Sequence, residues 1–149
     1  MNVPTDIDKR APVLAHHEIE IQAPLETIWR LQTDVNGWPD WHKDVTAARL
    51  DGPFQPGASF TWTSGGFTVT STIYSVAERA RTLWGGLANG IMGIHEWVYR
   101  ETPTGVHVST QESFSGDPVA AQVAGMQSIL DKSLTDWLND LKAAAESRR

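Results

Sequence analysis

The chain has 149 residues, a formal net charge of −6 and no cysteine. Its length suits one domain with a core of its own. An acidic chain with 12 scattered Lys and Arg residues lacks the basic surface of nucleic-acid-binding proteins, and a chain without cysteine forms no disulfide and no thiolate-based zinc site.

The first twelve residues are polar and contain Pro4 and Pro12, so we predict a flexible N-terminal leader over residues 1–12. They include no apolar segment typical of a signal peptide or a membrane span. We therefore expect a cytoplasmic protein without a membrane span.

Residues 13–22 alternate between apolar and polar side chains, which predicts a strand with one solvated face. Residues 23–26 (APLE) are typical of a helix start, because proline fits the first turn and glutamate meets the positive end of the helix dipole. Asn36-Gly37 and Pro39 interrupt this helix, and we expect a second short helix or turn at residues 41–45.

Six further strand-like runs lie between turn residues, at positions 45–50, 58–63, 67–76, 82–87, 91–101 and 106–114. Their connections are too short for crossover helices, so the sheet should be antiparallel. Residues 118–146 carry apolar side chains at every third or fourth position, which predicts one long amphipathic helix with its apolar face against the sheet.

Several short motifs follow one another in the order of a known family. They are residues 19–29 (IEIQAPLETIW), 38–41 (WPDW), 57–62 (GASFTW), 81–84 (RTLW), 95–97 (HEW), 104–108 (TGVHV) and 112–116 (ESFSG). With the element order, they resemble the START/Bet v 1-like (SRPBCC) superfamily in its bacterial polyketide cyclase/dehydrase and lipid-transport branch. The resemblance covers about residues 13–145.

This resemblance implies a single α+β domain over residues 13–147 with the helix-grip fold. In that fold a curved antiparallel seven-stranded sheet wraps around a long C-terminal helix, two short helices follow the first strand, and the interior holds a cavity. Similar proteins include polyketide aromatases and cyclases as well as lipid and hormone carriers. The resemblance therefore leaves the activity open, and the function has to be argued from the site.

The hairpin that turns at residues 102–105 predicts a polar pair. If Glu101 pairs with Val106, then His95 lies opposite Glu112, and both face the same side of the sheet. Apolar Val106 and other residues of the last strand favour that side as the inner one. A slip of one residue would invert the assignment.

An imidazole beside a carboxylate is a workable general acid or base, because the carboxylate raises the imidazole pKa and orients the ring. His95 and Glu112 are therefore the candidate catalytic residues. Two other readings stay open: the pair anchors a polar group of a ligand, or it is a structural hydrogen-bonded pair.

Seven tryptophans favour a pocket for flat apolar ligands, although many of these rings will be ordinary core. Strand alternation, the resemblance (Trp41 and Trp84) and the helix pattern give the expected ligand-contacting residues: Trp41, Phe60, Trp62, Val69, Ser71, Ile73, Trp84, Trp97, Tyr99, Thr110, Met126 and Leu130. His42, beside Lys43 and Asp44, is expected to be solvated.

A phosphate-binding glycine loop, a His-Glu-x-x-His helix and a Gly-x-Ser-x-Gly elbow are all absent from the sequence. We therefore expect neither metal nor cofactor. The expected partner is an apolar, aromatic or polyketide-like small molecule. The protein would either catalyse its cyclisation, aromatisation or dehydration by acid-base chemistry, or carry an apolar ligand or lipid unchanged, as a monomer or homodimer.

Overall fold

The computed structural model describes residues 3–148. In chain order its elements are β1 (Val13–Ile21), α1 (Leu25–Thr33), η1 (Val35–Asp40), β2 (Val45–Arg49), β3 (Ser59–Ser64), β4 (Phe67–Ala77), β5 (Arg81–Ala88), β6 (Ile91–Thr102), β7 (Gly105–Ser115), α2 (Asp117–Ala121) and α3 (Val123–Ser147). None of the helices within the described residues is long and apolar enough to cross a membrane.

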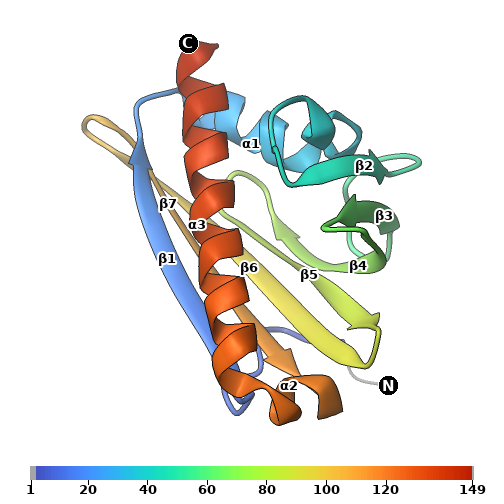
Figure 1. Cartoon of the computed structure of the whole chain (residues 1–149). Helices are drawn as coiled ribbons and strands as arrows, with labels where there is room; N and C mark the ends of the chain where they lie inside the picture. Colours follow the sequence, from blue (N-terminus) through green and yellow to red (C-terminus); the bar gives the residue numbers. More distant parts are fainter. Residues whose placement is uncertain (1–2, 149) are drawn as a thin grey trace.

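The seven strands form one antiparallel sheet in the order β1-β7-β6-β5-β4-β3-β2. The sheet curves around α3, which runs along its concave face, while α1 and η1 lie at the end where the chain terminates (Figure 1). The predicted helix-grip fold is confirmed. Short turns between strands 3 to 7 leave no room for crossovers, which accounts for the antiparallel order.

The second short helix lies earlier than the sequence predicts. It is the 3-10 helix η1, within the segment expected to be a break. Residues 41–44 contain turns, the other form that the sequence allowed, and no helix. Trp38 is fully buried, and its Nε1 donates a hydrogen bond to the Gln32 carbonyl (3.2 Å). Burial of this indole outweighs the poor helix propensity of the Asn36-Gly37 and Pro39 positions, and a 3-10 turn accommodates them.

The predicted single helix over residues 118–146 is wrong, because the chain breaks at Gln122 (φ −145°, ψ 55°) into α2 and α3. The break allows Val119 of α2 to pack fully buried against Val13 and Leu134. Val123, which the periodicity placed on the buried face, is 41% exposed.

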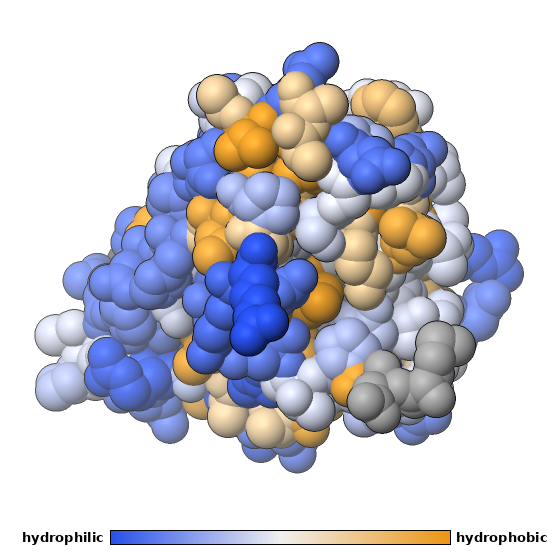
Figure 2. Space-filling view, turned by 90° about the horizontal axis from the view of Figure 1, so that it is seen from below, coloured by the Kyte–Doolittle hydropathy of each residue, from blue (hydrophilic) through white to orange (hydrophobic). Residues whose placement is uncertain are grey.

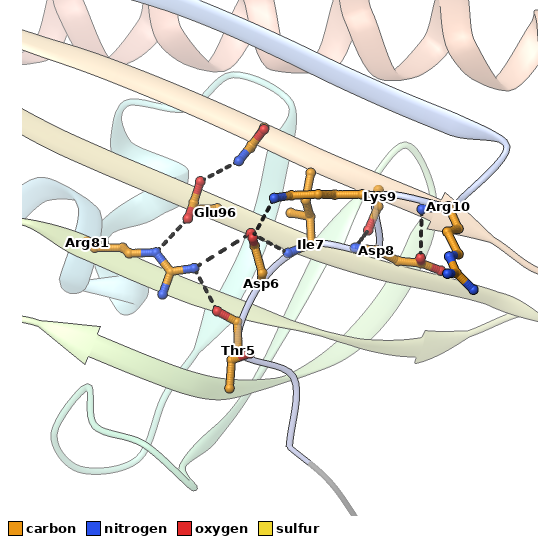
Figure 3. A network of polar contacts seen from close by, with 10 residues as sticks. Thr5, Asp6, Ile7, Asp8, Lys9, Arg10, Arg81 and Glu96 are labelled. Carbon is orange, nitrogen blue, oxygen red and sulfur yellow. Dashed lines mark hydrogen bonds and ion pairs between the residues drawn. The ribbon is translucent and has the colours of Figure 1, made fainter.

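The described part of the predicted flexible leader, from Val3 onward, packs on the outer face of the sheet, while residues 1 and 2 lie outside the described residues. Ile7 is buried against Leu83 and Ile94. Arg81 donates to the Thr5 carbonyl (3.0 Å), as Figure 3 shows. The backbone N–H of Asp8 donates to Ser113 Oγ (3.0 Å). The prediction fails because apolar side chains on the outer face of β5 and β6 need a cover.

Replacing Ile7 by aspartate should lower the free energy of unfolding by about 1–3 kcal/mol, because a buried apolar contact is lost and a charge is placed against Leu83 and Ile94. Urea denaturation followed by tryptophan fluorescence measures the loss. Val3→Asp, at an exposed position of the same segment, is the matched control. Equal midpoints for the two variants would contradict the packing of this segment.

Candidate functional site

The β6–β7 register is the predicted one: Glu101 pairs with Val106, and His95 lies opposite Glu112. The His95 side of the hairpin faces α3, since the His95 ring lies 5.4 Å from the Trp137 ring. The inner face of the hairpin therefore carries His95 and Glu112, as the alternation predicts.

Trp137 of α3 is the centre of an aromatic cluster between helix and sheet. It is 2% exposed. The rings within 4.4–6.0 Å of it are those of Trp38, His42, Trp62, Trp84, His95 and Trp97. Edge-on and tilted contacts of this kind suit the charge distribution of aromatic rings.

Beside this cluster, at the N-terminal end of α3, lies an apolar pocket of about 330 Å³. Of the predicted site residues, the structure brings six together on its wall: Trp62, Val69, Ser71, Trp84, Glu112 and Met126. Gly85, Gly86 and Gly93 also line it. A methyl group added at Gly85 would collide with the Gly93 carbonyl, whereas one added at Gly93 would lie beside Glu112 and Phe114.

Exposed Phe67 and Ile129 also line the pocket. Figure 2 looks onto the end of the molecule that carries α2, where apolar side chains reach the surface in separate areas among polar ones.

The other predicted site residues lie outside this pocket. His95, Phe60, Ile73, Trp97, Tyr99, Thr110 and Leu130 are buried. Trp41 lies at the opposite end of α3, in a polar surface depression of about 360 Å³ whose walls include Arg30, Asp34 and Asp40. Charged walls do not suit an apolar ligand, so the apolar pocket beside the aromatic cluster is the better candidate for the ligand site.

Among residues 3–148, Glu112 is the only ionisable residue on the pocket wall. Its Oε1 lies 3.3 Å from His95 Nδ1, and its side chain is 15% exposed. His95, 1% exposed, lies behind it and places Nε2 2.7 Å from Thr110 Oγ1. Thr110 in turn donates to the Glu96 carbonyl (2.8 Å).

Burial sets the protonation of this pair. It lowers the pKa of His95 to about 3, with the nearby His42 acting in the same direction, and it raises the pKa of Glu112 to about 8. The expected rise in the imidazole pKa is therefore not found, because loss of hydration outweighs attraction to the carboxyl. At neutral pH both groups are uncharged.

Residues 13–146 match the family described as polyketide cyclase / dehydrase and lipid transport. The chain belongs to this family. No curated protein matches the sequence.

Solved structures similar to this chain share its fold. A hypothetical protein of Helicobacter pylori has a TM-score of 0.81 and 18% identity over 97% of this chain and 99% of its own. A START superfamily protein of Mycobacterium smegmatis has a TM-score of 0.72 and 13% identity, covering 91% and 99%. The di-domain ARO/CYC StfQ from the steffimycin biosynthetic pathway has a TM-score of 0.73 and 14% identity, covering 91% of this chain and 51% of its own.

Gln32 holds the aromatic cluster in place, a role that the sequence did not reveal. Its Oε1 accepts from Trp137 Nε1 (3.1 Å), and its Nε2 donates to the Tyr99 hydroxyl (3.0 Å). Burial raises the pKa of Tyr99 and keeps this hydroxyl neutral. The spacing of the apolar residues in α1 did not predict that the amide of Gln32 points inward.

A second buried polar pair joins His42 to Asp140. His42, expected to be solvated, is 2% exposed, and its Nδ1 lies 3.2 Å from Asp140 Oδ2. Burial lowers the pKa of His42, while Asp140 opposes the change. The prediction failed because polar neighbours suggested solvent, whereas packing on Trp137 (4.4 Å between rings) decides the position.

Within residues 3–148, no group of three or more His, Asp or Glu side chains converges as metal ligands would. The expectation of a site without metal or cofactor stays a prediction.

Proposed function

We propose that this protein binds an apolar, aromatic or polyketide-like small molecule in the pocket beside Trp62 and Trp84. We further propose that Glu112 exchanges protons with that molecule in a cofactor-free cyclisation, aromatisation or dehydration. The observation that carries the proposal is an apolar pocket with one buried carboxyl on its wall and a buried imidazole behind it. Buried acid-base groups with shifted pKa values are typical of functional sites.

Pocket size narrows the ligand class. A volume of about 330 Å³ lies at the small end of the range for ligand pockets, which runs from about 300 to 1,000 Å³. It favours a compact ring system over a sterol or a long acyl chain.

A ligand panel tests the proposal. The protein is titrated with polyphenols, fatty acids and sterols. Compact aromatic compounds should quench tryptophan fluorescence, because Trp62 and Trp84 line the pocket. Mass spectrometry of the incubated mixtures detects conversion. A flat response to every apolar ligand would contradict the proposal.

A carrier without catalysis is the second candidate, favoured by the burial of His95. At 1% exposure and off the pocket wall, this imidazole cannot touch a ligand. Binding without a product, in wild type and Glu112→Gln alike, would support the carrier. Conversion in wild type that is lost in Glu112→Gln while binding persists would support the enzyme.

Filling the pocket should block binding. Met126→Trp places a larger side chain on the pocket wall and should weaken binding of a quenching ligand about tenfold or more, since the ring competes for the same space. Ser128→Trp, at an exposed position of the same helix, is the control and should bind normally. Equal affinities for the two variants would place the ligand elsewhere.

A further inference from the structure

The two hydrogen bonds behind Glu112, between His95 and Thr110 and between Thr110 and the Glu96 carbonyl, have a single direction. A carbonyl oxygen only accepts, so Thr110 uses its one hydroxyl hydrogen on the Glu96 carbonyl (2.8 Å). Thr110 Oγ1 must then accept from His95 Nε2, 2.7 Å away. His95 therefore carries a hydrogen on Nε2.

This direction decides where the next proton lies. In a neutral His95 with Nε2–H, Nδ1 is an acceptor, and it lies 3.3 Å from Glu112 Oε1. Two acceptors at this distance would repel, so Oε1 carries the proton. In a charged pair, Nδ1 would carry it instead. In both cases the proton lies between Nδ1 and Oε1, and Oε2 is left as a pure acceptor.

Oε2 is the oxygen that a ligand can reach. Glu112 and Gly93 both line the pocket, and a methyl group added at Gly93 would lie 3.4 Å from Oε2. Among the described residues Oε2 has no hydrogen-bond partner. An acceptor facing an apolar pocket is best satisfied by a donor on the ligand.

The rest of the pocket wall offers little to a charged ligand. No Lys, Arg or His side chain of the described part of the chain lines it. Ser71 Oγ accepts a hydrogen bond from Trp62 Nε1 (3.0 Å), and its remaining hydroxyl hydrogen is a neutral donor that supplies no counter-charge. An anion would therefore lose hydration without a counter-charge and would face an oxygen acceptor.

We propose that Thr110 is a positioning residue that fixes the direction of these hydrogen bonds. The pocket therefore selects an uncharged ligand with a hydroxyl donor, such as a phenol or an enol, and it rejects carboxylates. The hydroxyl donates to Glu112 Oε2. This inference rests on the proposed function in requiring that the pocket binds a small molecule.

Three naphthalene probes of similar size separate the possibilities by calorimetry: 2-naphthol donates, 2-acetylnaphthalene only accepts, and 2-naphthoate is an anion. Wild type should bind 2-naphthol about tenfold more tightly than 2-acetylnaphthalene, as expected for one satisfied hydrogen bond, and 2-naphthoate most weakly. Glu112→Gln should keep this order, because its amide can donate to Nδ1 and present its oxygen to the pocket.

Thr110→Val removes the acceptor for Nε2–H and frees the other tautomer. Nδ1–H then donates to Oε1, the carboxyl proton moves to Oε2, and the preference should shift toward 2-acetylnaphthalene. Thr110→Ser keeps the hydroxyl and should restore the wild-type order. A purely structural role would weaken all probes equally and leave their order unchanged.

Nitrogen-15 NMR of His95 reads the tautomer directly and needs no ligand. We expect Nε2 to be protonated and Nδ1 to be unprotonated in wild type. Because this measurement uses the wild-type protein, it tests the inference even if Thr110→Val does not fold. Equal binding of 2-naphthol and 2-acetylnaphthalene, or an unprotonated Nε2, would overturn the inference and leave the proposed function standing. Absence of binding by all three probes would overturn both.

Discussion

Replacing Trp137 by alanine is expected to destabilise the protein by about 3–5 kcal/mol, the usual cost of truncating a buried large aromatic side chain. Trp137 is 2% exposed and touches rings from α3's neighbours on several strands, among them Trp84 and Trp97. The change also leaves Gln32 Oε1 without its donor. Urea unfolding monitored by circular dichroism measures the loss.

Ile129→Ala on the same helix is the matched control, because Ile129 is largely exposed. It should change the free energy of unfolding by less than about 1 kcal/mol. Similar midpoints for Trp137→Ala and Ile129→Ala would show that the aromatic cluster does not hold helix and sheet together.

Replacing Glu112 by glutamine is expected to remove a pH dependence of stability between about pH 5 and pH 8. Burial raises the pKa of the folded Glu112 to about 8, whereas the unfolded carboxyl loses its proton near pH 4.5. Between these values the folded state holds a proton that the unfolded state has released. Stability therefore falls as pH rises, by up to about 1.4 kcal/mol per pH unit.

Glutamine does not ionise, so the stability of Glu112→Gln relative to wild type should rise steadily from pH 5 to pH 8. The lowered pKa of His95 acts in the opposite sense, reducing stability as pH falls below about 6.5. It is present in both proteins and largely cancels in the difference. Thermal unfolding at several pH values measures the effect, with exposed Glu101→Gln as control. Parallel curves for wild type and Glu112→Gln would contradict the burial of this carboxyl.

The local sequence was sufficient to predict that His95 lies opposite Glu112. The turn at residues 102–105 is short, and pairing Glu101 with Val106 across it sets the register of the alternating strands on either side. His95 opposite Glu112 follows from that register alone.

The alternation of side chains along the strands identified the inner face of the sheet, but it did not show which residues fill the space between that face and α3. Phe60, Ile73, Trp97 and Tyr99 point inward as predicted, yet they are buried in the core and do not line the pocket. Whether an inward side chain meets a ligand depends on the volume of the facing helix residues. In this protein Trp137 supplies much of that volume.

Long-range packing explains the remaining misses. His42 has polar neighbours in sequence, and its burial depends on Asp140, which lies 98 residues away. Ile7 stands in a polar segment, and its cover is the outer face of β5 and β6. Single-sequence patterns do not report contacts of this kind.

A crystal structure of the protein grown with 2-naphthol tests most directly whether the pocket is the ligand site and Glu112 its polar contact. We predict ring density in the space bounded by Trp62, Trp84 and Met126, with the hydroxyl within hydrogen-bond distance of Glu112 Oε2. Density for 2-naphthol only at other surfaces, with this pocket empty, would contradict the account.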